Sequence, residues 1–223
     1  MKIIKPSVTI NKDKDAVAIL KNLEYAGRVC YNSVDKINDD SYKLFIRNIL
    51  KRGHLAVIEH ESITAEVVCD RAIANQIVRH RLASYGQEST RYVNYKEGIE
   101  VIEPNCFWKI DDTKTQMRRA IWLNAMTYAE DSYQKMIEHG ATPDEARSVL
   151  PSALATKLVM TYNLRQWRHF FKLRCEKHAH PQMKEIADML LDEMVKYLPE
   201  IFGDIKDNFS KSAIVDRLLG VKQ

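Results

Sequence analysis

The sequence predicts an α+β protein: a single domain, residues 1–223, in which an antiparallel-leaning sheet packs with several helices. Residues 62–68 have alternating apolar side chains, as in a half-buried strand, and residues 154–162 predict a second strand. Between them, residues 113–138 have apolar side chains at helical spacing, which predicts one long amphipathic helix. The 223 residues are 45% hydrophobic, enough for one core, and no linker or repeat divides them.

The first elements follow from capping residues and apolar spacing. Residues 1–10 predict a strand. Asp13 and Asp15 can open the next helix, because aspartate is favoured at a helix N-cap. Its apolar positions recur at helical spacing: Val17, Leu20, Leu23, Ala26 and Cys30. A second helix is predicted over roughly 40–52, and it ends at Gly53, a favourable C-terminal cap residue.

In the middle of the chain, the strand over 62–68 is expected to bury one face, formed by Ile63, Ala65 and Val67. Asp70 can cap a helix over roughly 71–81, in which Ile73 and Ile77 face the core. Residues 83–107 predict short β or irregular segments.

The long helix over 113–138 is expected to bury an apolar stripe, whose members are Met117, Ile121, Ala125, Tyr128, Tyr133, Met136 and Ile137. A short helix begins at about Pro143 and ends before Pro151, because proline cannot continue a helix. The remaining predicted elements are a strand over 154–162 and helices over 164–174 and 181–198.

The composition predicts a cytoplasmic protein without a membrane segment. No apolar run approaches the length of a membrane span, and the N-terminus does not have the pattern of a signal peptide. The four scattered cysteines indicate reduced thiols rather than disulfides. A net charge of +4 is too small to predict nucleic-acid binding, and the weak His178-Ala-His180 pattern does not predict a metal site.

Phosphate binding, if present, must rely on side chains. The chain has only seven glycines and neither a Gly-x-Gly-x-x-Gly nor a Gly-Lys-Ser/Thr loop. Basic residues are nevertheless concentrated in two places, residues 71–92 and 161–178. Since the guanidinium group suits bidentate contacts with phosphate, these two segments predict discrete anion sites.

In the first basic segment, Gln76 and Arg79 are expected on one helix face, with Arg79, His80 and Arg81 at the helix end. A solvated basic helix end is the simpler interpretation. However, the following loop combines Ser84, Ser89 and Thr90 with Arg91, as a phosphate-binding loop does, and the sequence leaves both interpretations open.

In the second basic segment, Arg174 shares a helical face with Leu164, Trp167 and Phe171, whereas Arg165 and His169 share another. An arginine beside apolar residues needs an anionic partner. That partner is either a bound ligand or a carboxylate, for which Glu59, Glu176 and Glu185 are candidates, and spacing does not choose between them.

Four ordered motifs resemble the flavin-dependent thymidylate synthases. Arg79-His80-Arg81, then seven residues, Ser89 and Arg91-Tyr92 is similar to the signature of that family. The other matching segments are Gly53-His54 with Glu59-His60, Glu145-Ala146-Arg147 before Leu150-Pro151, and Asn163-x-Arg165 with Leu173-Arg174.

The resemblance implies an enzyme that methylates dUMP to dTMP, with FAD as cofactor and 5,10-methylenetetrahydrofolate and NADPH as cosubstrates. It implies FAD contacts from His54, Ala56, Arg79, His80, Arg81, Gln87, Asn163, Arg165 and His169. It implies dUMP contacts from Gln76, Arg79, Gln87, Glu88, Ser89, Thr90, Arg91, Arg147 and Arg174.

Arg174 is the expected catalytic residue, because a positive charge beside the uracil carbonyl favours its polarised form. Ser89 is interpreted as a ligand contact, because no His–Asp pair is evident to activate it as a nucleophile. Cys175, beside Arg174, is not interpreted as a nucleophile either. The chain departs from the family at Ala56, where a hydroxyl is common, at His169, where some relatives have asparagine, and over 179–186.

The resemblance further implies a homotetramer with active sites shared between subunits. The sequence leaves two alternatives open. One is a module that binds nucleic-acid backbone through the basic segments, with Tyr85, Tyr92 and Tyr95 stacking on bases. The other is a flavin reductase without a nucleotide substrate.

Overall fold

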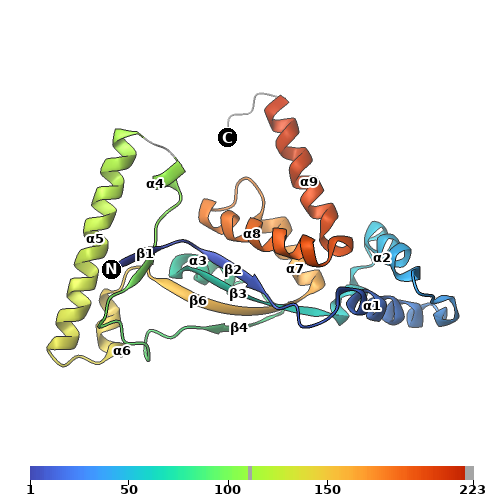
Figure 1. The fold of residues 1–223 in the computed structure, drawn as a ribbon, viewed down its shortest axis with the longest axis horizontal. Helices are drawn as coiled ribbons and strands as arrows, with labels where there is room; N and C mark the ends of the chain where they lie inside the picture. Colours follow the sequence, from blue (N-terminus) through green and yellow to red (C-terminus); the bar gives the residue numbers. More distant parts are fainter. Residues whose placement is uncertain (110–111, 219–223) are drawn as a thin grey trace.

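The computed structural model describes the backbone of residues 1–109 and 112–218 and the side chains of 1–107 and 112–210. Its centre is a four-stranded antiparallel sheet with the strand order β2-β3-β6-β4. These strands are β2 Ser7–Ile10, β3 Ser62–Asp70, β4 Ala83–Gln87 and β6 Ala155–Asn163. A two-stranded parallel sheet joins β1, Lys2–Ile4, to β5, Glu100–Ile102. Together with the helices, this arrangement confirms the predicted α+β class (Figure 1).

The central sheet has one buried face and one partly open face. Ile63, Ala65 and Val67 are buried, as predicted, and pair in register with the buried side of β6. On the open face, the Thr64 and Thr161 hydroxyls are hydrogen-bonded at 2.8 Å. This separation follows from the two-residue period of a strand, which sends successive side chains to opposite faces.

Helices from the C-terminal half cover the buried face. They are α7 Leu164–Arg174 and α8 Pro181–Tyr197, and α9 Pro199–Leu218 packs on both of these helices (Figure 1). Trp167 and Phe171 of α7 are fully buried, and the Trp167 indole N–H donates to the backbone oxygen of Ile63 at 3.0 Å. This bond fixes α7 on β3 in addition to the apolar contacts, which dominate the stability of such a layer.

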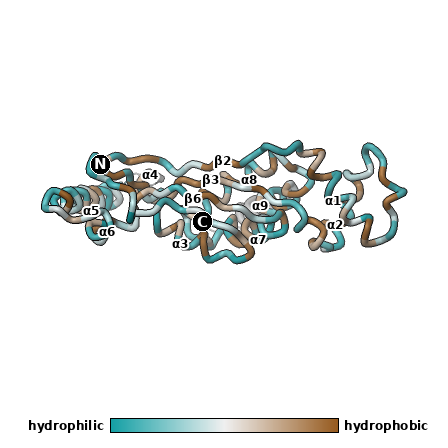
Figure 2. The backbone as a smooth tube through the Cα atoms, turned by 90° about the horizontal axis from the view of Figure 1, so that it is seen from below, coloured by the Kyte–Doolittle hydropathy of each residue, from teal (hydrophilic) through white to brown (hydrophobic). Residues whose placement is uncertain are grey.

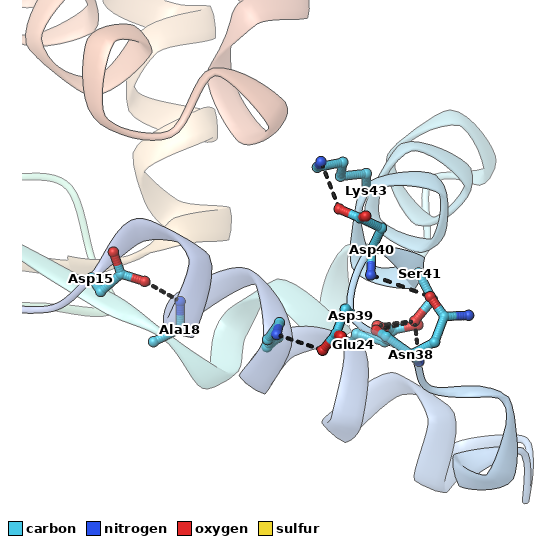
Figure 3. A network of polar contacts seen from close by, with 9 residues as sticks. Asp15, Ala18, Glu24, Asn38, Asp39, Asp40, Ser41 and Lys43 are labelled. Carbon is cyan, nitrogen blue, oxygen red and sulfur yellow. Dashed lines mark hydrogen bonds and ion pairs between the residues drawn. The ribbon is translucent and has the colours of Figure 1, made fainter.

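Helices α1, Ala16–Cys30, and α2, Ser41–Arg52, form a projecting pair. The Asp15 carboxylate caps α1 by accepting from the Ala18 backbone amide at 2.9 Å (Figure 3). Gly53 ends α2 in the left-handed conformation, as predicted. Between the helices, the buried carboxylate of Glu24 accepts from the Ser41 hydroxyl at 2.8 Å. The 3-10 helix η1, Val34–Lys36, lies in their connection.

Short elements link these helices to the sheet. The 3-10 helix η2, Leu55–His60, precedes β3, and helix α3, Arg71–Ile77, begins after Asp70, whose carboxylate accepts from the Ile73 amide at 2.8 Å. Helix α6, Pro143–Ala146, and the 3-10 helix η3, Arg147–Val149, together correspond to the short helix predicted between Pro143 and Pro151.

Helix α5, Thr113–Glu138, has the predicted bounds and lies at one end of a flat molecule, with α1 and α2 at the other (Figure 2). It follows the short helix α4, Cys106–Lys109. A small second cluster of buried residues supports α5: Ile99, Val101, Met126 and Leu154. Of all the described helices, none is both long and apolar enough to cross a membrane.

The predicted strand over 1–10 is wrong in one respect: it is two strands in different sheets, separated by Lys5-Pro6. Proline lacks the amide hydrogen that a continuous ladder requires. The predicted helix over 71–81 ends earlier, at Ile77. The Tyr85 hydroxyl lies 3.0 Å from the Ile77 carbonyl oxygen and 2.7 Å from that of His80, which stabilises a turn instead.

Two predicted apolar stripes are partly wrong. In α1, Val17 and Cys30 are exposed, and the buried face is formed by Ile19, Leu20 and Leu23. In α5, Tyr133 is buried as predicted, but Met117, Ile121 and Tyr128 are 63%, 68% and 76% exposed. Helix α9 was not predicted.

The packing of α1 on α2 leaves no room at Gly27 of α1. A Cβ atom there would lie 2.5 Å from Cζ of Phe45 and 3.2 Å from Cγ1 of Val57. We predict that Gly27→Ala lowers the free energy of unfolding by about 1–3 kcal/mol, because overpacking outweighs the helix preference of alanine. Urea unfolding measures the change.

Gly203→Ala in α9 is the matched control, since no described atom lies within 4 Å of a Cβ added there. It is expected to be neutral or to stabilise by about 0.5–1 kcal/mol. Equal effects of the two substitutions would contradict the packing argument.

Candidate functional site

Strand β4 separates the predicted site residues into two groups. The turn before β4 carries Arg79, His80 and Arg81, beside α7 with Asn163, Arg165, His169 and Arg174. The segment at the other end of β4 carries Gln87, Glu88, Ser89, Thr90 and Arg91, and Arg91 contacts α6 near Arg147. Five strand residues span about 13 Å, so one chain presents two distinct groups.

In the first group, Arg174 pairs with His80. The Arg174 Nε donates to His80 Nε2 at 2.9 Å. Since arginine has no acceptor, His80 Nε2 must be unprotonated, and the neutral ring carries its proton on Nδ1. Burial, the Arg174 charge and His169 together lower the pKa of His80 to about 4, which agrees with this tautomer.

None of the three glutamates considered as partners of Arg174 forms an ion pair with it. Glu59 pairs with Arg165 at 2.6 Å, Glu185 accepts from the Asn105 amide at 3.1 Å, and Glu176 is exposed. Within the described side chains, no carboxylate forms an ion pair with Arg174. Its hydrogen-bond partner is a neutral imidazole, so its positive charge is not neutralised by an ion pair.

Two tyrosines, the half-buried Tyr85 and the buried Tyr162, hold the His80 turn in place. The Tyr85 hydroxyl donates to the His80 carbonyl oxygen at 2.7 Å and accepts from the Tyr162 hydroxyl at 2.8 Å. Burial raises the pKa of Tyr85, and burial together with the hydrogen bond to Tyr85 raises that of Tyr162. Both phenols therefore remain protonated, and the Phe170 ring contacts His80 edge-on at 5.0 Å. Sequence reasoning missed Tyr162 and interpreted Tyr85 only as a stacking residue.

A cleft of about 480 Å³ lies beside the His80 turn. Its lining residues come from η2, the turn before β4 and α7: Leu55, Glu59, Leu82, Asn163, Arg165, Gln166, Arg168, His169 and Lys172. Asn163 is also the N-cap of α7, where its side-chain oxygen accepts from the Gln166 amide at 2.8 Å. The structure thus brings together three predicted cofactor residues, Asn163, Arg165 and His169.

Leu82 was not predicted as part of the cleft. It is 82% exposed and has a φ of 65°, a left-handed conformation that a branched side chain rarely adopts. Such strain persists only where the surrounding structure determines it, and it is frequent at functional sites.

The other predicted residues of this end are exposed or lie apart. Arg79, Arg81 and Ala56 are exposed, and Gln76 is half-buried in α3. His54 precedes η2, and its Nδ1 lies 3.1 Å from the Tyr31 hydroxyl in a hollow of about 210 Å³ between α1 and α2. The larger cleft between α2 and α9, about 740 Å³, contains none of the predicted site residues.

In the second group, Arg91 and Arg147 converge on Asp144. Arg91 Nε lies 3.3 Å and Arg147 Nη2 lies 3.0 Å from the same Asp144 oxygen. The Ser89 hydroxyl accepts from the Arg91 amide at 3.3 Å. The three charged side chains are about half exposed. The sequence predicted the two arginines but gave no signal for Asp144, which is 53 residues from Arg91.

Half-buried polar side chains hold the segment after β4 in place. Arg71 Nη1 donates to the Glu88 carbonyl oxygen at 3.3 Å, and the Tyr95 hydroxyl donates to the Glu88 carboxylate at 2.9 Å. The Gln87 side-chain amide donates to the Thr156 hydroxyl at 3.3 Å, and Thr90 is buried. These inward contacts of Tyr85 and Tyr95 leave only Tyr92 exposed among the three tyrosines considered for base stacking.

The chain matches a known family over most of its length. The family described as "Thymidylate synthase complementing protein" matches residues 16–200. A flavin-dependent thymidylate synthase from Geobacter sulfurreducens is 35% identical over 187 residues, which cover 80% of this chain and 78% of the relative. The corresponding enzyme from Pyrococcus abyssi is 34% identical over 184 residues, 79% of this chain and 75% of the relative.

A solved structure has the same fold. It is the crystal structure of the UMP/dUMP methylase PolB from Streptomyces cacaoi bound with 5-Br dUMP. The TM-score is 0.75 at 22% identity, and the match covers 93% of this chain and 97% of the other.

The fold, the motifs and the matches together define a flavin-dependent methyltransferase. The chain belongs to the flavin-dependent thymidylate synthases, the family described as thymidylate synthase complementing protein.

The neutral state of His80 gives a pH-dependent stability. Its pKa in the folded protein, about 4, lies below its ordinary value of 6.5. As pH falls below 6.5, the unfolded chain binds a proton at His80 that the folded chain does not bind until about pH 4. We therefore predict that His80 makes the protein less stable across this range, by up to about 1.4 kcal/mol per pH unit.

His80→Gln places an amide oxygen near the Nε2 position and does not titrate. Urea unfolding from pH 7 to pH 4 is expected to show a smaller loss of stability for His80→Gln than for the wild type. Parallel curves for the two proteins would mean that His80 is not held neutral.

Proposed function

We propose that the chain catalyses the reductive methylation of dUMP to dTMP, with the whole of residues 1–223 acting as one catalytic domain. 5,10-Methylenetetrahydrofolate is the carbon donor, and FAD, reduced by NADPH, is the cofactor. The observation that carries this proposal is the Arg174 guanidinium, held at 2.9 Å by a neutral imidazole with no described carboxylate beside it. Such a charge can stabilise negative charge that develops on a pyrimidine carbonyl.

The residues of the 480 Å³ cleft fit a flavin nucleotide. Arg165, His169 and Lys172 provide donors for its phosphates, and Leu55 and Leu82 provide apolar surface for a ring. Side chains thereby replace the glycine-rich loop that the chain lacks. When bound, the reduced flavin supplies the hydride that converts a methylene into a methyl group.

At the other end of β4, Arg91, Arg147 and the Ser89 hydroxyl suit the phosphate of dUMP. In this proposal they hold the nucleotide, and Arg174 favours the polarised form of the uracil. Gln76 and Arg79 contribute further dUMP contacts, and His54 lies toward the folate.

Cys175 is not a nucleophile in this proposal. It is 2% exposed, and burial together with the Asp188 carboxylate raises the pKa of its thiol above the ordinary value. The thiolate, which is the reactive form, is therefore disfavoured.

Purified protein is expected to show a flavin absorption spectrum and to form dTMP from dUMP, methylenetetrahydrofolate and NADPH. In the same assay, we predict that Arg174→Ala lowers kcat/KM by about 10²–10³-fold, because one preorganised electrostatic contact is lost. Flavin content and dUMP binding are measured in parallel to separate chemistry from binding.

Cys175→Ala is the control, since it changes the neighbouring residue without touching the proposed charge. It is expected to retain most of its turnover. Turnover that survives Arg174→Ala, or disappears in Cys175→Ala with flavin and dUMP still bound, would contradict the assigned roles.

We further propose a homotetramer in which different subunits supply the two groups of site residues. The accessible surface is 13262 Å², whereas a compact monomer of this size exposes about 10,500 Å². Met117, Ile121, Ala125 and Tyr128 form an exposed apolar stripe on α5. Apolar stripes of this kind are typical of protein interfaces.

Ile121→Glu places a charge in the centre of the α5 stripe, and we predict that it shifts the protein toward smaller species. The reason is the desolvation cost of a buried, unpaired carboxylate. Light scattering after size-exclusion chromatography measures the mass. Thr127→Glu, on another exposed face of α5, is expected to remain assembled. Equal masses for wild type and Ile121→Glu would exclude this stripe as an interface.

A further inference from the structure

The contact between Arg91, Arg147 and Asp144 has a consequence for nucleotide affinity. Both guanidiniums approach the same carboxylate oxygen, at 3.3 Å and 3.0 Å. They come from segments more than 50 residues apart, the loop after β4 and the end of α6. Two like charges are held together there by one negative group, in the arrangement by which two arginines clamp a phosphate.

The backbone of Asp144 cannot move away easily. Asp144 follows Pro143 in α6, and the capping box of that helix is complete: the Thr142 amide donates to the Glu145 carboxylate at 2.7 Å, and the Glu145 amide donates to the Thr142 hydroxyl at 3.3 Å. In addition, Arg147 Nε donates to the Asp144 carbonyl oxygen at 3.2 Å. A rotation of the Asp144 side chain therefore still leaves its charge near the two arginines.

We propose that Asp144 is an internal counter-ion of the phosphate subsite, which competes with the phosphate of the nucleotide and thereby sets its affinity. This inference rests on the proposed function, since it takes Arg91 and Arg147 as the phosphate contacts. A nucleotide phosphate carries nearly two negative charges at neutral pH. To bind both guanidiniums, it must displace the carboxylate and then tolerate its repulsion.

The competition between the Asp144 carboxylate and the phosphate outweighs any benefit that Asp144 provides by holding the two arginines in place. Asp144, Arg91 and Arg147 are all 43–56% exposed, and ion pairs between exposed groups contribute little to the stability of an arrangement. In contrast, a negative charge that remains within a few ångströms of a phosphate opposes binding whether or not the arginines were ordered before.

Asp144→Asn removes the charge and keeps the shape. We expect the KM and the Kd for dUMP to fall by about three- to tenfold, the effect of weakening two exposed ion pairs. The affinity for deoxyuridine, which lacks the phosphate, is expected to be unchanged, whereas inorganic phosphate should inhibit the variant at lower concentrations than the wild type. Asp144→Glu retains the charge and should resemble the wild type.

Asp35→Asn is the matched control, because it removes the same charge from an exposed residue of η1, remote from α6. Its dUMP affinity is expected to equal that of the wild type. A KM for dUMP that is unchanged or raised in Asp144→Asn, or an equal gain for deoxyuridine, overturns the role of Asp144. A wild type that binds neither dUMP nor phosphate instead refutes the proposed function itself.

Discussion

The pairing of β4 with β6 is the constraint on which the rest of the site depends. Its antiparallel register places Ala83 opposite Tyr162 and Gln87 opposite Leu158. One end of β4 therefore lies near the start of α7 and the 480 Å³ cleft, and it follows the turn whose His80 binds Arg174 at the end of α7. The other end of β4 lies near α6 and its arginines. A shift of one residue would turn Tyr85 away from Tyr162 and remove the support of the His80 turn.

The electrostatics of the two ends differ in a way that suits different tasks. At the α7 end, a buried neutral imidazole orients Arg174 without neutralising it, so its charge remains available to a bound group. At the α6 end, two exposed arginines share a carboxylate, which suits reversible exchange with another anion. The first arrangement favours chemistry on a polar ring, and the second favours binding of a phosphate.

Local signals explain which parts of the fold the sequence predicts. The bounds of α5 follow from the Asp112 cap and the turn after Glu138, and those of α7 from Asn163, so both were predictable. The end of α3 was not, because the Tyr85 hydroxyl that lies near its last carbonyl groups comes from the next strand. The partners of the arginines were also unpredictable. Asp144 and His80 reach Arg91 and Arg174 through contacts between distant segments, and no spacing rule describes these contacts.

The misplaced stripe of α5 has a physical meaning beyond a prediction error. Periodicity indicates that a helical face avoids water, but it does not say whether the same chain covers that face. In this chain Tyr133 is covered from within, whereas Ile121 and Tyr128 are not. Helix α5 also contacts α6, so its exposed stripe lies at the same end of the molecule as Arg91 and Arg147 (Figure 1). Because the proposed assembly and the proposed phosphate subsite share this end of the molecule, a change in either is expected to affect the other.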